Sequence, residues 1–240
     1  MKKSFGYAFA AATVLTVTAC GGGGGGDSTP TPPASVALAQ ALRTVETTGI
    51  QKTFNITGSA ISGGQSFDVT GSLQLSASGY NTPTTFEGQP ALSETSTVNG
   101  TLNVNGQALP LASTSQNFVT SNYVPLGFAA AGFYCVVTSS TPLPATASVG
   151  TVGTYFTAAC YTDSTKAVPV GTETDTYAVS AGTTSSNLTA TTISTLVDLN
   201  NVQIASEQHA YLIDTAGGVT FRSIALTMTD SGVVLNVSGT

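Results

Sequence analysis

From residue 50 onward, apolar and polar side chains alternate with a period of two. In segment 67–77 one face carries Phe67, Val69, Gly71, Leu73, Leu75 and Ala77, and the other carries Asp68, Thr70, Ser72, Gln74 and Ser76. This alternation is typical of an antiparallel strand with one buried face. A turn at residues 62–64 would pair this strand with the preceding segment 53–60, which contains Phe54 and Ile56.

The same pattern returns at residues 98–113 and in the last third of the chain, whereas segment 124–137 is a nearly unbroken apolar run. Asn105-Gly106 between two apolar runs is a strong hairpin signal, and Pro110 predicts that the returning strand has an edge or a bulge there. Five further strand-like segments are 175–181, 187–199, 202–214, 218–229 and 232–240. The pattern predicts an all-β fold: an antiparallel meander forming a half-barrel, barrel-like or sandwich domain, with one short N-terminal helix.

That helix is predicted between residues 35 and 49. Leu38, Ala41, Leu42 and Val45 form one apolar stripe at helical spacing. Ser35 is a candidate cap at its start, and Gly49 marks its end. The alternative is a polar linker that continues to residue 50.

The first residues have the form of an export signal. Lys2 and Lys3 precede an apolar run from Phe5 to Val17, and small residues lead to Cys20. Residues 21–35 are rich in Gly and then in Pro, a composition that favours a flexible and then extended tether. We therefore divide the chain into a signal at 1–19, a cysteine and tether at 20–35, and a single β-rich domain at 36–240.

The stretch "VTAC" at residues 17–20 resembles the lipobox of bacterial lipoproteins, with Val17 in place of the preferred leucine. The chain as a whole is similar to a group of bacterial lipoproteins of unassigned activity that have a polyglycine tether and a β-rich body. The resemblance implies cleavage before Cys20 and attachment of fatty acyl chains, such as palmitate, to this residue. Together these chains anchor a protein stably in a bilayer. It also implies an outer-membrane lipoprotein at the periplasmic face or cell surface; the alternative is an ordinary secretory signal.

The charge balance excludes one class of partner. Charged residues make up only 8% of the chain, and the formal net charge is −6. Cleavage of the signal would also remove Lys2 and Lys3, two of the six basic residues. No basic surface for nucleic acid is therefore expected.

The other two cysteines are expected to form a structural disulfide. With Cys20 acylated, Cys135 and Cys160 remain as an even pair in an oxidising compartment. Their separation is unlike the closely spaced cysteines of redox motifs. One histidine and paired cysteines leave no zinc constellation, so no metal and no cofactor is expected.

Aromatic residues gather around this cysteine pair. The group consists of Phe118, Tyr123, Phe128, Phe133, Tyr134, Tyr155, Phe156 and Tyr161. One interpretation is a hydrophobic core beneath a disulfide-bonded loop. The other is a pocket for an apolar ligand or a surface for a partner.

Candidate chemistry is sparse. Alternation places Glu207, His209 and Tyr211 on one strand face, where they could support proton transfer or be polar sheet-surface residues. Glu173 and Asp175 likewise share a strand face, but no calcium-loop motif accompanies them. No residue is assigned a catalytic role.

We therefore expect a non-enzymatic envelope protein held to the bilayer through Cys20. Resemblance to half-barrel lipoproteins that carry lipids implies an apolar, acyl-type ligand. The first alternative is a surface-displayed structural or interaction protein that binds another envelope protein. The remote alternative is an enzyme.

Overall fold

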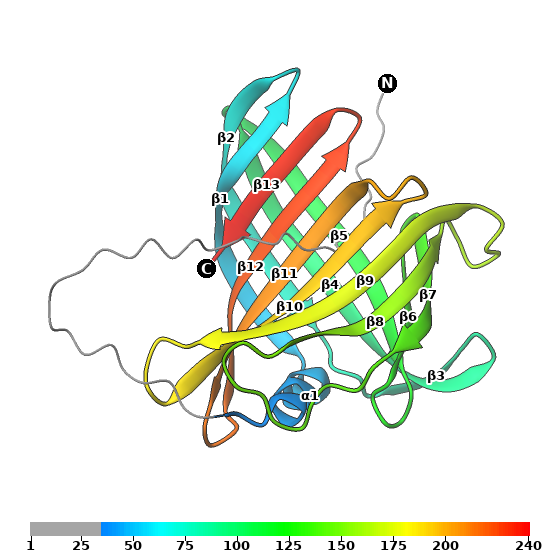
Figure 1. Ribbon diagram of the computed structural model, residues 1–240. Helices are drawn as coiled ribbons and strands as arrows, with labels where there is room; N and C mark the ends of the chain where they lie inside the picture. Colours follow the sequence, from blue (N-terminus) through cyan, green and yellow to red (C-terminus); the bar gives the residue numbers. More distant parts are fainter. Residues whose placement is uncertain (1–34) are drawn as a thin grey trace, which may run out of the picture.

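The computed structural model describes residues 35–240, which form one large β-structure with a short helix at one end (Figure 1). The predicted signal, Cys20 and nearly all of the tether lie outside the described residues. The helix is α1 (Leu38–Thr48), and the strands are β1 (Ile50–Ser62), β2 (Gln65–Ala77), β3 (Thr82–Phe86), β4 (Gln89–Val104), β5 (Gln107–Val119), β6 (Pro125–Ala130), β7 (Phe133–Ser140), β8 (Val152–Tyr161), β9 (Pro169–Ala181), β10 (Asn187–Asp198), β11 (Gln203–Asp214), β12 (Val219–Asp230) and β13 (Val233–Gly239).

Twelve of these strands close into an antiparallel barrel. Sequential strands pair from β4 to β13, β13 returns to pair with β1, and β2 pairs with both β1 and β4. Strand β3 stands outside this ring and pairs only with the first residues of β4. The all-β prediction is confirmed, but the half-barrel and sandwich alternatives are wrong. Closure gives the strands that would be edges in those folds a partner on each side.

The predicted alternation of β2 defines the inside and outside of the barrel. Val69, Leu73 and Leu75 are buried in the main core, while Asp68 and Thr70 are exposed. Strand β1 repeats the pattern, with Phe54 and Ile56 buried in the same core. The alternation predicted strands with one buried face, and in the structure these strands form the wall of the barrel.

Glycine allows the backbones of β2 and β4 to approach closely. A Cβ atom at Gly71 would collide with the Thr101 carbonyl oxygen, and one at Gly100 would collide with the Ser72 carbonyl oxygen. Gly71 pairs with Leu102, and Gly100 pairs with Leu73. The absence of side chains at these inward positions lets the two backbones approach closely.

Helix α1 lies at one end of the barrel (Figure 1). Leu38, Ala41 and Leu42 are buried in the core shared with the strands, and Val45 packs against it. Gly49 ends the helix with a positive φ of 76°, as predicted. The predicted cap at Ser35 is wrong, because the helix begins at Leu38 and no side chain caps it. Val36 instead forms a backbone bridge with Ala147, which fixes where the helix starts.

Two smaller predictions about β5 are confirmed. Asn105 and Gly106 have positive φ values of 51° and 76° and join β4 to β5 in a tight hairpin. Pro110 lies in the part of β5 that pairs with β4 alone, since β6 pairs only from Ser115 onward. An edge therefore accommodates the missing N–H of proline.

The predicted disulfide is present. Cys135 of β7 and Cys160 of β8 are directly opposite each other and are bonded through their sulfur atoms. Both are buried with Phe133, Ala158 and Leu196 in a second apolar cluster. The disulfide therefore links adjacent strands of the wall and closes a covalent loop that contains the connection between them.

A carboxyl-lined chamber as candidate functional site

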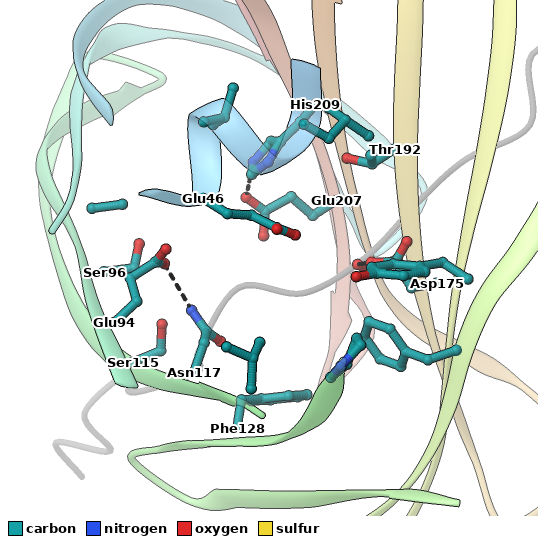
Figure 2. Close-up of a pocket in the computed structure, with 18 of the residues that line it drawn as sticks. Glu46, Glu94, Ser96, Ser115, Asn117, Phe128, Asp175, Thr192, Glu207 and His209 are labelled. Atoms are coloured by element: carbon teal, nitrogen blue, oxygen red, sulfur yellow. Dashed lines mark hydrogen bonds and ion pairs between the residues drawn. The ribbon is translucent and has the colours of Figure 1, made fainter. Parts of the chain in front are cut away.

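Part of the barrel interior is not filled by side chains. It contains a cavity with a volume of about 280 Å³, lined by residues of α1, β1, β2 and β4–β11. Polar side chains line much of it, as Figure 2 shows. We call this cavity the chamber.

Strands β9, β10 and β11 form one wall of the chamber. Asp175, Ser194 and Glu207 lie opposite one another across the three strands, and Ser194 Oγ donates a hydrogen bond of 2.9 Å to Asp175 Oδ2. Two residues further along, Thr192 is opposite His209. The period of two thus brings both predicted pairs, Glu173 with Asp175 and Glu207 with His209, to the inner face.

The remaining carboxyl groups come from other elements. Glu46 reaches the chamber from α1, and Glu94 reaches it from β4 (Figure 2). Asn117 Nδ2 of β5 donates a hydrogen bond of 3.1 Å to Glu94 Oε1. Carboxyl groups from four elements therefore surround one space.

Two carboxyl oxygens in this chamber have no hydrogen-bond partner: Glu173 Oε2 and Asp175 Oδ1. The Glu173 residue is only 2% exposed. Leaving a buried polar atom unpaired costs about 1–3 kcal/mol, and more if it is charged. Within residues 35–240, these two oxygens are the buried side-chain polar atoms that lack a hydrogen-bond partner.

Burial dominates the electrostatics of the carboxyl groups. It raises the pKa of Glu46 to about 7, although nearby Arg43 opposes the shift. It raises the pKa of Asp175 to about 7 against the hydrogen bond from Ser194. The pKa of Glu94 is raised and that of Glu173 lies well above its usual range, in both cases mainly through burial.

His209 is the basic residue on this wall of the chamber. Its Nε2 is hydrogen-bonded to Glu207 Oε1, and Nδ1 lies 3.5 Å from the Tyr211 hydroxyl. Burial lowers its pKa, but the carboxylates of Glu207, Asp175 and Glu94 outweigh burial, so the pKa is raised overall. Glu207, His209 and Tyr211 do share a face, as predicted, but that face is the interior and not the sheet surface.

Tyrosine hydroxyls complete the polar lining. Burial raises the pKa of Tyr80, Tyr155 and Tyr211, and the neighbouring carboxyl groups add to the shift. These phenols therefore stay protonated at neutral pH and act as hydrogen-bond donors.

The eight clustered aromatic residues lie in several places. Phe128, Tyr155 and Phe156 line the chamber, whereas Phe133 packs beside the disulfide. Phe118 and Tyr134 stack on Phe86 of β3, with ring centroids 4.4 and 5.3 Å away. Phe118 also borders the chamber.

The other two aromatic residues of this group are elsewhere. Tyr123 lies in the β5–β6 loop, where the Arg43 guanidinium is 5.0 Å from its ring centre. Tyr161 is opposite Tyr134 at the end of β8. The residues that are close together in sequence therefore do not form one continuous surface.

Glu46 and Glu94 are chamber residues that the sequence analysis missed. Glu94 has the same parity as Val98 and Leu102 in β4, so alternation carried a signal that it points inward. Glu46 follows Leu42 and Val45 along the helix, which places it at the margin of the apolar stripe.

Metal-ligating groups are not clustered in the chamber. Within residues 35–240, the only three ligand atoms of His, Cys, Asp or Glu that lie within 4.8 Å of one another belong to Cys135, Cys160 and Glu173. The two cysteines are joined in the disulfide, so they offer no thiolate for a metal.

No helix within residues 35–240 is long and apolar enough to cross a membrane. Comparisons with protein-family models, with curated proteins and with solved structures found no match to this chain.

Proposed function

We propose that this protein is a non-enzymatic binding protein of the bacterial envelope, and that its barrel holds a small polar ligand in the chamber. The observation that carries the proposal is the pair of unpartnered oxygens on Glu173 and Asp175, two residues that line the chamber. A ligand with hydrogen-bond donors would satisfy both atoms. Concave sites with a few convergent polar groups are the usual form of small-molecule sites.

The polar wall favours such a ligand over an acyl chain. An acyl chain in the chamber would leave Glu173 Oε2 and Asp175 Oδ1 without partners and would exclude water from the carboxyl groups that line it. The aromatic residues expected to contact such a chain are also divided between the chamber, the disulfide cluster and the outer wall.

The binding proposal is tested by filling the chamber. Ser115 faces the chamber from β5, and its neighbour Thr114 is exposed on the outer face, so Ser115→Phe and Thr114→Phe are a matched pair. We expect native mass spectrometry of protein purified gently from its own host to show a bound small molecule. The molecule should remain in Thr114→Phe and be absent from Ser115→Phe.

Two results would contradict the binding proposal. One is wild-type protein without any bound molecule that also takes up none from a host metabolite extract. The other is a molecule that stays bound equally in both phenylalanine variants. Circular dichroism and thermal unfolding of the two variants check that each has folded.

The envelope location rests on the lipobox resemblance at Cys20 and is also a proposal. Cys20→Ser should retain the signal and lose the acyl chains, which supply the anchoring free energy. Membrane fractionation and intact-mass measurement check this, with Cys135→Ser as a control that keeps Cys20. Acyl chains still present on Cys20→Ser would contradict the assignment.

A further inference from the structure

The chamber gathers carboxyl groups without a matching number of basic side chains. Five carboxyl groups, from Glu46, Glu94, Glu173, Asp175 and Glu207, line it, and within residues 35–240 His209 is the only basic side chain among the lining residues. The nearest guanidinium, that of Arg43, donates to the Asn122 carbonyl oxygen and lies over the Tyr123 ring. An anionic ligand would meet repulsion here, whereas a cation would relieve it.

The spacing of the carboxyl groups argues against a single metal ion. Calcium takes six or more oxygen ligands close together. No three carboxylate or imidazole ligand atoms of the chamber come within 4.8 Å of one another in the described residues. The charges are instead distributed over α1, β4, β9 and β11, and this distribution suits a ligand whose own charges are separated.

The surfaces between the carboxyl groups are aromatic or aliphatic. Phe128, Tyr155, Phe156 and Tyr177 line the chamber, together with Val98. Aromatic faces attract ammonium groups, and these side chains also pack well against methylene groups. Carboxyl groups and apolar surfaces therefore alternate along the chamber lining.

The unpartnered oxygens indicate which donor is missing. Glu173 Oε2 and Asp175 Oδ1 lie on the same face of β9, two residues apart, and neither accepts a hydrogen bond. An ammonium group brings several N–H donors and a positive charge, so it would satisfy buried carboxylates better than a neutral donor.

We infer that the chamber binds a linear organic polyamine, a chain in which two or more ammonium groups are separated by short methylene segments. This inference rests on the proposed binding function and names its ligand class. The ammonium groups pair with the Asp175 and Glu173 side of the chamber and with the Glu94 side, while the methylene segments contact the aromatic rings between them.

Proton linkage gives the inference a distinctive signature. The pKa of Glu46 and that of Asp175 are about 7, so both carboxyl groups are partly protonated near neutral pH. A polyamine binds the ionised forms, and its affinity should rise about tenfold between pH 6 and pH 8 for each such group. The titratable and charged groups around them are Arg43, Tyr80, Glu94, Tyr155, Glu173, Glu207, His209 and Tyr211.

Titration calorimetry of the intact protein with spermidine and putrescine tests the inference. Butylamine, with one charge, and 1,4-butanediol, with none, serve as matched ligands, and Ca²⁺ is the metal probe. We expect spermidine and putrescine to bind and to release protons at pH 7. Butylamine should bind about tenfold or more weakly, because it lacks one charge-assisted contact, and 1,4-butanediol should not bind.

Variants locate the site. Asp175→Asn and Glu94→Gln should each lower spermidine affinity about tenfold or more, since each removes one buried charge. Asp68→Asn, an exposed carboxylate of β2, should leave the affinity unchanged. If Asp175→Asn does not fold, Glu94→Gln alone tests the same contact type on the opposite wall.

The outcomes separate the inference from the proposed function. Spermidine binding that Asp68→Asn weakens as much as Asp175→Asn would overturn the inference, because the binding would be a general surface effect. Tighter binding of Ca²⁺ than of spermidine, or of butylamine equal to putrescine, would also overturn it. If the polyamines do not bind but another molecule is retained and then lost in Ser115→Phe, the ligand class is wrong and the binding function stands.

Discussion

The interior of the barrel has two regions with opposite construction. Along β1, β2 and the second half of β4, the inward positions carry large apolar groups such as Phe54, Leu73 and Leu102, and these pack into one continuous core. Around β9–β11, inward positions carry Asp175 and Ser194, and a cavity remains. The same alternation therefore builds both a packed core and a polar space.

The hollow part of the barrel coincides with small inward side chains on β5 and β10. Ser113, Ser115, Thr192 and Ser194 are small inward residues beside the chamber. In the packed region the equivalent positions are filled by leucine, isoleucine and phenylalanine. The packed region stabilises the barrel, and the chamber region carries buried charge at a cost in stability.

The largest predicted difference between the two regions is in how much a side-chain truncation lowers the free energy of unfolding. Phe54 is fully buried, so Phe54→Ala should lower the free energy of unfolding by about 3–5 kcal/mol. Ser115→Ala in the chamber should change it by about 0.5 kcal/mol or less. Urea unfolding measures both, and similar losses for the two variants would contradict the division into regions.

The next effect concerns the charge of the chamber. The folded-state pKa of Asp175 is about 7, above its ordinary value of 3.8, so the folded protein holds a proton that the unfolded chain has lost. The free energy of unfolding should therefore fall as pH rises from about 4 to 7, by on the order of a few kcal/mol. The raised pKa of His209 acts in the same direction, but only as pH rises above its ordinary pKa of 6.5.

Asp175→Asn sharpens this test, because the amide cannot ionise. Urea unfolding at several pH values should show a weaker pH dependence for this variant than for the wild-type protein. At pH 8 the ligand-free variant should be more stable than the wild-type protein. Asp68→Asn is the exposed control, and a stability that rises with pH in the wild-type protein would contradict the assignment of buried charge.

A smaller effect is expected at the close approach of β2 and β4 in the packed region. Gly71→Ala should lower stability by about 1–3 kcal/mol, because the new Cβ collides with the Thr101 carbonyl oxygen. Ser72→Ala, one position along on the outer face, should be close to neutral. Equal thermal unfolding temperatures for the two variants would show that the wall does not depend on this close approach.

Local pattern predicted the strands but not their closure. The alternation in 67–77 and the Asn105-Gly106 turn depend on neighbouring residues, so both were visible in the sequence. The pairing of β1 with β13 joins segments at opposite ends of the described chain, and no local signal specifies it. A half-barrel and a closed barrel have the same strand pattern, and only the long-range pairing separates them.

The candidate site was visible only in part. Alternation placed Glu173 with Asp175, and Glu207 with His209, but it did not show that these pairs face the same space as Glu94 and Glu46. For the aromatic residues, the sequence suggested a single cluster that the structure does not contain. Tyr134 and Cys135 are adjacent in sequence, yet they point to opposite faces of β7, so a dense aromatic segment did not become one surface.

Local periodicity, turn chemistry and the count of cysteines were enough to predict helix α1, strands β1, β2, β4, β5 and β9–β13, the Asn105-Gly106 turn and the pairing of Cys135 with Cys160. Strands β3 and β6–β8 were not recognised, because their segments lack a clear alternation of apolar and polar residues. Only the tertiary structure decided that the sheet closes and that carboxyl groups from α1, β4, β9 and β11 converge. Convergence follows from the order of the strands around the ring. That order is set by hydrogen bonding between distant segments and by burial of a shared core. No single stretch of the chain contains enough information to specify either.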